Sequence, residues 1–316
     1  MDEHTSSGPA RPTVTVIITT FNRAATVGRA IRSVLDQTWQ DWELIVVDDC
    51  STDGTEQAVR SFADDRIRYI RHDRNRRVSA ARNTGIRCAR GEYVAFLDDD
   101  DEWLPAKLEI ELEVFRSSDP EVGLVYAGML VLDDGGRVVR ARTEKASGWV
   151  YDALLDHNFI GSPSRIMVKK QVLDRVAGFD ETFFNYEDWE LCLRVARVSK
   201  IAPVPWCLVK RHLVTEWKTS SLRNLCVGQE GILRKFRGDM EPRTLAGQLA
   251  AVAVMLFNYE PRRARGLAWE SLRLRPRQFW LGASLAASML GTGFYRWFFR
   301  RMMKRRDKLH LGRARI

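Results

Sequence analysis

The sequence predicts an α/β fold with a mostly parallel sheet flanked by helices, followed by a helical C-terminal extension. Runs of β-branched residues alternate with segments of helical periodicity through the first hundred residues, which is the spacing of βαβ units. From Leu222 onward the pattern is helical, and no segment there resembles a strand. The chain has 316 residues and is 45% hydrophobic, enough for one large domain and an appendage.

The first strand is predicted at Val14–Thr20, a β-branched run, and the helix after it at Ala24–Gln37, where Val27, Ile31, Val34 and Leu35 recur at helical spacing. A second strand, Glu43–Asp49, ends in carboxylates and a turn with helix-capping residues. The next predicted elements are helix Thr55–Ala63, strand Ile67–Ile70, helix Val78–Ala89 and strand Gly91–Leu97.

Beyond the fourth strand the alternation is looser. Pro105 fits the first turn of a helix over Leu104–Arg116. A hairpin is expected where Asp133-Asp134-Gly135-Gly136 separates Gly123–Leu132 from Arg137–Ala141. The remaining predictions are a strand at Ile166–Val168 and helices at Lys170–Val176 and Trp189–Ala196.

These patterns predict three regions. Residues 1–12 are polar and are expected to be a disordered lead-in, and residues 13–221 form the α/β domain, with halves at 13–103 and 104–221. Residues 222–316 form the helical C-terminal region. The N-terminus lacks the apolar segment of a secretory signal, so a cytoplasmic location is expected.

The net charge indicates which classes of partner the chain could bind, and the cysteine content indicates the redox state of its compartment. The net charge is +9, a balance typical of proteins that meet nucleic acid, an anionic membrane or phosphorylated substrates. The five cysteines are scattered and odd in number, without a CxxC pair, which argues against a disulfide framework or a zinc site. A reducing compartment fits this usage.

Polar residues follow three of the predicted strands at the point where each strand ends. They are Thr19 to Asn22, then Asp48 and Asp49, then Asp98 to Asp101. In open α/β sheets, ligands bind beyond the carboxyl ends of the strands. The sequence therefore predicts one rim that gathers a hydroxyl and several carboxylates, rather than unrelated polar loops.

The run of four aspartates in FLDDDDEW is expected to hold a cation. On extended backbone, Asp98 and Asp100 would point the same way. Two carboxylates on one side form a hard oxygen site for Mg²⁺ or Mn²⁺, whose coordination is commonly completed by substrate phosphates. The alternative is a solvated acidic turn before a helix.

Arginines are concentrated between Arg71 and Arg90. Guanidinium groups match phosphate oxygens in geometry and charge. Arg82 and Asn83 lie directly before the acidic strand, and we expect them near a pyrophosphate or the acidic cluster.

Four stretches in order, VTVIITTFNR, AIRSVLDQTWQDWELIVVDDCSTDGT, AARNTGI and GEYVAFLDDDD, resemble inverting family-2 glycosyltransferases with a GT-A fold. The resemblance runs from about Val14 to Val195. It implies transfer of a sugar from a nucleotide-diphosphate sugar to an acceptor hydroxyl, with Mn²⁺ or Mg²⁺ as cofactor.

By this resemblance, Thr19 and Phe21, with Asn22 beside them, line the nucleotide. Asp49 meets the base, with Asp48 beside it; Asp98 and Asp99 face the ribose and sugar, and Asp100 is the metal ligand.

An inverting transfer needs a general base on the acceptor side. Gly178-Phe179-Asp180-Glu181 followed by Glu187-Asp188-Trp189 resembles the acceptor-side motif of the family, which implies Asp188 as the base and Glu187 as its partner. The alternative is simple capping of a helix by acids. Trp189 is expected to be a buried helix aromatic rather than a sugar platform.

Two further assignments follow from the same resemblance. His212 lies where some relatives carry a histidine near the metal, although a lone histidine is more often structural. Residues Phe159 to Ser164 are expected to form a wall of the acceptor site. The acceptor implied is a glycan or a lipid-linked sugar in polysaccharide, lipopolysaccharide or other glycoconjugate synthesis.

The C-terminal stretch 279–299 is rich in apolar and aromatic residues and is followed by arginines and lysines. A membrane span needs about 20 apolar residues, and Arg296 with several small polar residues weakens that interpretation. Three interpretations stay open: a helix lying on the cytoplasmic face of the inner membrane, against anionic lipid; a helix packed on the protein; and a membrane span.

Three rival functions remain from the residues alone. The net charge would suit a nucleic-acid-binding protein, but acids at the rim would repel a phosphate backbone, so no nucleic acid partner is expected. A nucleotidyltransferase would need a glycine-rich phosphate loop, which Thr19-Thr20-Phe21-Asn22 does not supply. The presence of both Asp100 and Asp188 argues against a catalytically inactive binding module.

Overall fold

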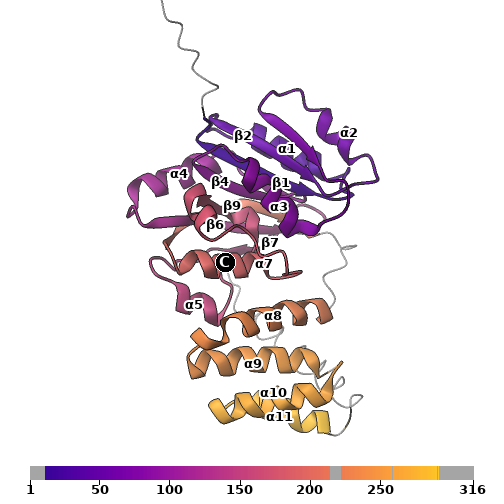
Figure 1. Ribbon diagram of the computed structural model, residues 1–316, viewed down its shortest axis with the longest axis vertical. Coiled ribbons are helices and arrows are strands. Elements are labelled where there is room, and N and C mark those ends of the chain that lie inside the picture. Colours follow the sequence, from indigo (N-terminus) through magenta and orange to yellow (C-terminus); the bar gives the residue numbers. More distant parts are fainter. Residues whose placement is uncertain (1–10, 214–221, 258, 290, 292–316) are drawn as a thin grey trace, which may run out of the picture. The chain divides into compact units, whose positions relative to one another are not determined.

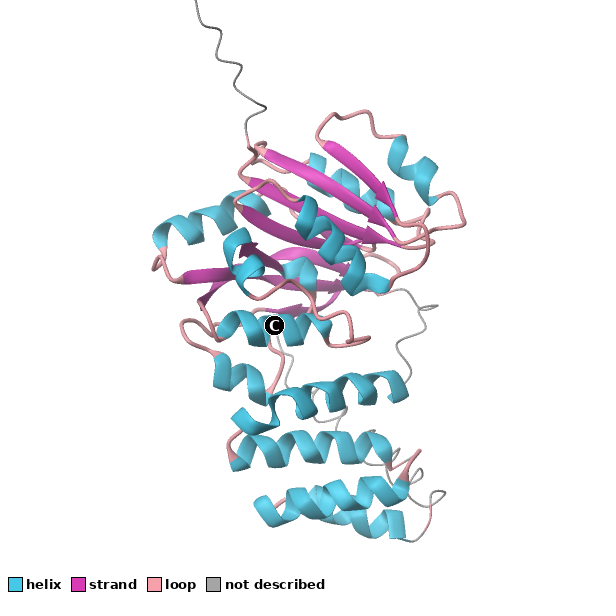
Figure 2. Cartoon of the chain, viewed as in Figure 1, coloured by secondary structure: helices cyan, strands magenta, loops and turns pink. Residues whose placement is uncertain are grey.

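The computed structural model describes residues 11–213, 222–257, 259–289 and 291, so most of the predicted lead-in lies outside the described residues. The chain divides into two compact units, Met1–Trp217 and Lys218–Ile316. The first unit is a sheet flanked by helices, and the second consists of stacked helices (Figures 1 and 2).

The elements of the first unit are given in chain order. They are β1 (Val14–Thr20), α1 (Val27–Leu35), β2 (Trp42–Asp48), α2 (Thr55–Arg60), β3 (Ile67–Arg71), α3 (Arg77–Cys88), β4 (Tyr93–Asp98), β5 (Asp101–Trp103), α4 (Lys107–Ser117), β6 (Val122–Leu132), β7 (Val138–Arg142), α5 (Tyr151–Asp156), η1 (Pro163–Arg165), β8 (Ile166–Lys169), α6 (Lys170–Arg175), α7 (Glu187–Ala196) and β9 (Lys200–His212).

Within the described residues, nine strands form one sheet in the order β3-β2-β1-β4-β8-β6-β9-β5, with β7 paired to β6. The first four strands pair in parallel, as predicted. Beyond β4 the sheet is mixed: the predicted hairpin is confirmed by the antiparallel pair β6–β7, β6 and β9 pair in parallel, and β8 is antiparallel to both β4 and β6. Ser164 of η1 accepts from the N–H of Asp98, the last residue of β4. Because β8 begins directly after η1, it starts at the carboxyl end of β4 and runs in the opposite direction.

Two helices cover opposite faces of the parallel strands. Val16 and Ile18 of β1 belong to a core cluster with Val27 and Ile31 of α1. Ile17 points to the other face, since side chains alternate along a strand. On that face α3 packs very closely, because a Cβ at Gly85 would lie 2.6 Å from Cγ2 of Ile17.

The longest strand, β9, was not predicted from the sequence. Pro203 and Pro205 interrupt its pattern, and proline cannot donate to a strand ladder. The structure accommodates them by shifting the register of the β6–β9 pairing between Tyr126 and Met129. This strand also pairs with β5, the short strand that begins at Asp101. The pairing therefore fixes the backbone at the end of the four-aspartate run.

The second unit contains only helices among its described residues. They are α8 (Leu222–Phe236), η2 (Arg237–Asp239), α9 (Pro242–Leu256), α10 (Pro261–Leu274) and α11 (Phe279–Met289). The Ser271 hydroxyl of α10 donates to the Ala246 carbonyl of α9 at 2.6 Å, and Arg265 of α10 donates to the Ser288 carbonyl of α11 at 2.7 Å. The helical character predicted from Leu222 is confirmed for these residues.

A buried ion pair lies beside the end of β5, where the Lys107 ammonium is 4.2 Å from the centre of the Trp103 ring. Lys107 and Glu111, one turn apart on α4, are fully buried with their charged atoms 2.6 Å apart. Burial raises the pKa of Glu111 to about 7 and lowers the pKa of Lys107. The desolvation cost of such a pair is comparable to its attraction, so the pair fixes geometry more than it adds stability.

The buried pair should respond asymmetrically to mutation. Glu111→Leu alone should lower the free energy of unfolding by about 3 kcal/mol, because it leaves the Lys107 ammonium buried without a partner. Lys107→Leu combined with Glu111→Leu should recover most of that loss. Urea unfolding measures both, and equal losses in the single and double variants would contradict the interpretation.

Candidate functional site

The carboxyl ends of β1, β2 and β4 meet at one rim of the sheet. Thr19 is in register with Asp98, and Thr20 with Asp48. The structure therefore brings together the hydroxyl and carboxylate residues that the sequence placed at separate strand ends.

Three carboxylates cluster at the end of β4. Asp98 ends the strand, Asp99 and Asp100 form a turn, and Asp101 begins β5. One carboxylate oxygen from each of Asp98, Asp100 and Asp101 lies within 4.8 Å of the other two. The extended backbone assumed for Asp98 and Asp100 is thus wrong, since a turn brings them together. It also adds Asp101, which was not among the predicted site residues although it belongs to the same run.

The cluster carries more negative charge than its surroundings compensate. Burial, reinforced by the charge of Asp98, raises the pKa of Asp100 to about 6 and that of Asp101 well above its usual range. The Ser164 hydroxyl donates to Asp101 at 2.6 Å. Carboxylate oxygens are the ligands that Mg²⁺ and Mn²⁺ prefer, so this donor set fits a divalent cation.

Asp99 lies outside this cluster. Its carboxylate faces Arg23, whose Nε is 3.8 Å from Oδ1. Burial raises the pKa of Asp99 to about 7. Arg23 follows β1 and was not predicted as a site residue.

Arg82 joins the acidic cluster to the segment predicted to hold the base. Its Nη2 donates to Asp98 at 2.8 Å and its Nη1 to Glu187 at 2.8 Å. The Arg82 side chain is 5% exposed, so both bonds form largely away from water. Two residues 105 positions apart in the sequence are thereby held together by one hydrogen-bonded ion pair.

Glu187 and Asp188 are the first residues of α7. Tyr186, directly before them, has a φ of 63°, a left-handed conformation that is uncommon for a bulky residue. Burial, with the neighbouring charge of Glu187, raises the pKa of Asp188 to about 7. Trp189 is buried and donates its ring N–H to the Leu154 carbonyl at 2.7 Å, which confirms the predicted packing role.

The Asn83 amide is occupied by the loop that precedes α7. Its Nδ2 donates to the Phe179 carbonyl and to Glu181, both at 2.9 Å, and its Oδ1 accepts from the Phe179 N–H at 2.8 Å. A Cβ at Gly178, whose φ is 65°, would lie 2.5 Å from that oxygen. Asn83, predicted to bind the nucleotide-sugar, bonds in the structure to the loop that precedes α7.

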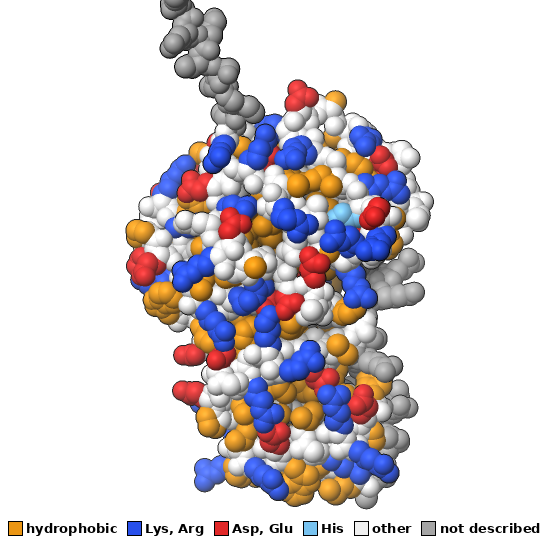
Figure 3. Space-filling model, viewed as in Figure 1, with side chains coloured by type: hydrophobic (Ala, Val, Ile, Leu, Met, Phe, Trp, Pro, Cys, Tyr) orange, Lys and Arg blue, Asp and Glu red, His pale blue; other side chains and the backbone are white. Residues whose placement is uncertain are grey.

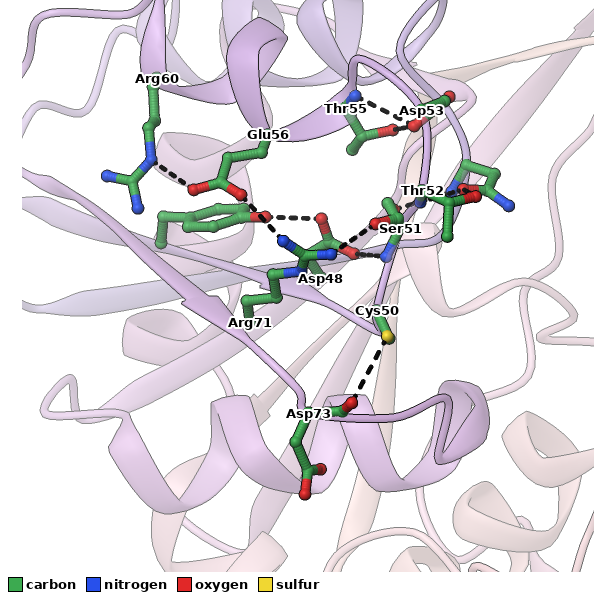
Figure 4. A network of polar contacts seen from close by, with 12 residues as sticks. Asp48, Cys50, Ser51, Thr52, Asp53, Thr55, Glu56, Arg60, Arg71 and Asp73 are labelled. Atoms are coloured by element: carbon green, nitrogen blue, oxygen red, sulfur yellow. Dashed lines mark hydrogen bonds and ion pairs between the residues drawn. The ribbon is translucent and has the colours of Figure 1, made fainter.

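Asp48 and Asp49 are buried and bonded within the protein. Asp48 accepts from the Ser51 N–H at 2.7 Å and from the Tyr69 hydroxyl at 2.6 Å, and Arg71 donates to the Ser51 carbonyl, as Figure 4 shows. Burial and Asp48 raise the pKa of Tyr69 far above its usual value. These contacts shape the wall where a nucleotide base was predicted.

Asp49 fixes the start of α3. Its carboxylate accepts from the backbone N–H groups of Arg76 and Arg77, at 2.8 and 2.6 Å, and lies 2.8 Å from His72 Nδ1. A carboxylate at a helix N-terminus satisfies N–H groups that have no partner within the helix. Asp49 therefore sets the position of the helix that carries Arg82.

The loop after β1 is tied to the loop after β2. Asn22 adopts a left-handed φ of 53° and accepts from the Thr52 N–H at 2.8 Å, while its own N–H donates to Ser51 Oγ at 2.9 Å. Phe21 remains 44% exposed, so its ring face is accessible, and Thr19 is nearly buried.

His212 has a partner outside the acidic cluster. Its Nε2 lies 3.2 Å from Glu102, which also accepts from Lys210 at 2.7 Å. Burial, with the nearby charge of Arg29, lowers the pKa of His212. The neighbouring Arg211 is the register partner of Asp101.

The segment predicted as an acceptor wall, Phe159 to Ser164, also contacts the acidic cluster. The Ser162 hydroxyl donates to Asp98 at 3.2 Å, and Ser164 Oγ accepts from the Asp98 N–H at 3.0 Å. Ser162 and Arg82 thus hold the Asp98 carboxylate, and Ser164 holds its backbone.

Comparisons with known proteins identify the family and the fold. Residues 15–176 match the family model described as glycosyl transferase family 2. The chain is 30% identical over 194 residues to the Escherichia coli protein named UDP-Glc:alpha-D-GlcNAc-diphosphoundecaprenol beta-1,3-glucosyltransferase WfgD, covering 60% of this chain and 72% of that one. It is 39% identical over 192 residues to the succinoglycan biosynthesis protein ExoO of Rhizobium meliloti, covering 57% and 54%.

A third relative, the putative teichuronic acid biosynthesis glycosyltransferase TuaG of Bacillus subtilis, is 32% identical over 51% of this chain and 64% of its own. Among solved structures, S. aureus TarS 1–349 superposes with a TM-score of 0.64 at 18% identity, covering 90% and 89% of the two chains. A mannosyltransferase from Pyrobaculum calidifontis, solved with GDP-Man and Mn²⁺, gives a TM-score of 0.57 at 20% identity, covering 90% and 87%. These likenesses establish the GT-A-type fold.

The excess charge in the cluster predicts a pH-dependent effect of Asp100→Asn in metal-free buffer. The pKa of Asp100 is raised on folding, so its contribution to stability is present at low pH and is lost as pH rises through about 6. The variant should therefore gain stability over the wild type between pH 5 and pH 7.5, by about 1 to 2 kcal/mol.

Chemical denaturation in EDTA at a series of pH values measures this gain. Asp65→Asn, an exposed carboxylate between α2 and β3, is the matched control and should show little change. A loss of stability in Asp100→Asn at pH 7.5 would contradict the raised pKa that burial and the Asp98 charge give Asp100.

Proposed function

The chain belongs to glycosyl transferase family 2, and from that premise we propose that it transfers a sugar from a nucleotide-diphosphate sugar to an acceptor hydroxyl with inversion at the anomeric carbon. The observation that carries the proposal is the Arg82 bridge between Asp98 of the acidic cluster and Glu187 beside Asp188. Through this one side chain, the carboxylates proposed to hold the donor are linked to the residue next to the proposed base.

The donor site is the rim of the parallel strands. Thr19 of β1 lines it with Phe21 and Asn22 of the loop after that strand, and the wall held by Asp48 and Asp49 supports the nucleotide base. Asp98, Asp100 and Asp101 would hold Mg²⁺ or Mn²⁺, with oxygen donors that fit these ions. Such a cation, when bound, offsets charge on the diphosphate as it leaves.

The acceptor hydroxyl attacks the anomeric carbon from the face opposite the diphosphate, forming the new C–O bond as the bond to the diphosphate oxygen breaks. Asp188 takes the proton of the attacking hydroxyl. A base with a pKa of about 7 is well matched to this task, since it is largely ionised at slightly alkaline pH and still basic enough to accept a proton. Arg82 holds Glu187 beside it, and Asn83 holds the loop that leads into α7.

The acceptor is proposed to be a glycan or a lipid-linked sugar in polysaccharide or related glycoconjugate synthesis, at the cytoplasmic side of the membrane. Names among the relatives support this, since they include a diphosphoundecaprenol-linked acceptor and succinoglycan and teichuronic acid biosynthesis. Family membership favours glycosyl transfer over the nucleotidyltransferase and nucleic-acid-binding alternatives.

We predict metal-dependent donor binding. In a thermal-shift panel of nucleotide diphosphates and nucleotide sugars, one nucleotide class with Mn²⁺ should stabilise the wild type. A ligand at about 100 times its Kd adds about 2.7 kcal/mol. EDTA, Asp100→Asn and Asp101→Asn should each abolish the shift.

His212→Ala is the informative control. The shift should persist in this variant, because Glu102 is the partner of His212 in the structure. Its loss would restore His212 as a metal ligand, and the absence of any shift across the panel would contradict the proposed function.

We also predict that kcat/KM rises with pH through an apparent pKa of about 7, since Asp188 must be ionised to accept the proton. Asp188→Asn should lower kcat/KM by ~100-fold or more and leave the thermal shift with donor unchanged. Asp174→Asn on α6, an exposed carboxylate, should retain full activity. A pH-independent rate in the wild type, or an active Asp188→Asn, would exclude Asp188 as the base.

A further inference from the structure

The turn between α10 and α11 exposes an unusual set of side chains. Phe279 and Trp280, the first residues of α11, are 82% and 70% exposed, the highest fractions among large apolar side chains in the described part of the chain. Leu274, which ends α10, is 38% exposed. In Figure 3, hydrophobic side chains lie beside Lys and Arg over the helices drawn lowest in Figure 1.

The backbone of this turn is held by internal hydrogen bonds. Gln278 Nε2 donates to Ser271 Oγ at 2.8 Å, and Ser271 Oγ itself donates to Ala246 of α9. The exposed aromatics thus stand on a turn that is anchored to the neighbouring helices. Water contact with two large rings is unfavourable, which points to a surface that is covered when the protein works.

Positive charge is interleaved with these apolar groups. Arg273, Arg275 and Arg277 are exposed, and no carboxylate among the described residues pairs with them. From Ser271 to Arg306 the sequence contains no Asp or Glu, and its nine basic residues are Arg273, Arg275, Arg277, Arg296, Arg300, Arg301, Lys304, Arg305 and Arg306. The partner of this surface must therefore be both anionic and able to receive aromatic rings.

We propose that this turn, Arg273–Trp280, binds the surface of an anionic lipid bilayer. At a bilayer surface, phosphate oxygens and hydrocarbon lie within a few ångströms of each other, which matches alternating arginines and apolar side chains. Trp at the interface and Arg among the headgroups are the preferred positions of these residues. A span is a different matter: among the described residues, no helix is long and apolar enough to cross a membrane.

This site differs from the one expected from the sequence alone. That expectation covered residues 279–299, of which 290 and 292–299 lie outside the described residues. The proposed contact is instead Arg273–Trp280, which joins the three arginines of the turn to the first two residues of α11. The inference does not rest on glycosyl transfer, and its test needs neither donor nor acceptor.

The experiment is co-sedimentation of the full chain with phosphatidylcholine vesicles that contain or lack phosphatidylglycerol, at low and high salt. The wild type should bind only the anionic vesicles, and more weakly at high salt. Replacing the three arginines by glutamine should weaken binding on the order of 100-fold, since each contributes about a fivefold factor. Phe279→Ser with Trp280→Ser should weaken it by ~10-fold or more.

Matched controls come from the first unit. Arg137, Arg140 and Arg175, all exposed, changed together to glutamine remove the same charge elsewhere. Trp206→Ser removes a tryptophan that is 61% exposed. Circular dichroism confirms that each variant is folded.

Both controls should bind as the wild type does. The proposal is overturned if the wild type binds no vesicle, or if it binds neutral vesicles as tightly as anionic ones. It is also overturned if the turn variants bind anionic vesicles as tightly as the control variants do. Failure here would leave the donor and base experiments untouched.

Discussion

A single buried guanidinium group determines the geometry of the catalytic unit. Arg82 holds Asp98 and Glu187 at 2.8 Å each with only 5% of its side chain exposed. Charge-assisted bonds of this kind are short and directional, and removing one partner would leave a buried charge without compensation. The separation between Asp98 and Glu187, the residue before Asp188, is therefore set by the two Nη atoms of one guanidinium group.

The rest of the scaffold positions that arginine. Asp49 caps the start of α3, and the absence of a side chain at Gly85 lets the helix pack tightly on Ile17. Asn83, next to Arg82, clamps the loop before α7 through three hydrogen bonds. Asp49 and Asn83 were predicted to bind the nucleotide-sugar. In the structure their side chains hold backbone segments next to Arg82 and α7. The strained backbone at Tyr186 shows where the loop is constrained most, directly before the proposed base.

The sequence predicted the parallel half of the sheet and the rim well, because βαβ alternation and acidic strand ends are local patterns. It did not predict the pairing of β8 or the existence of β9, since these depend on where the chain re-enters the sheet and on a register shift around Pro203. For the same reason Asp101 was missed. Its participation follows from a turn and from pairing with β9, neither of which is encoded in the spacing of four aspartates.

The net charge of the chain does not predict the sign of the local charge at this site. The chain carries +9, yet three carboxylates face one another at the rim, two of them with raised pKa values. Screening in physiological salt reduces charges beyond about 8 Å to minor terms, so arginines elsewhere do not neutralise the cluster. Arg82 is shared with Glu187, and the charges of Arg23 and Arg211 act on Asp100 without cancelling the rise in its pKa that burial and Asp98 cause. The local deficit of positive charge is therefore a property of the fold, and it is what a metal–diphosphate donor would relieve. The excess of positive charge lies instead in the sequence of the C-terminal unit, where Lys218 to Ile316 contains 21 Lys and Arg against 6 Asp and Glu, and there it can serve a different, anionic partner.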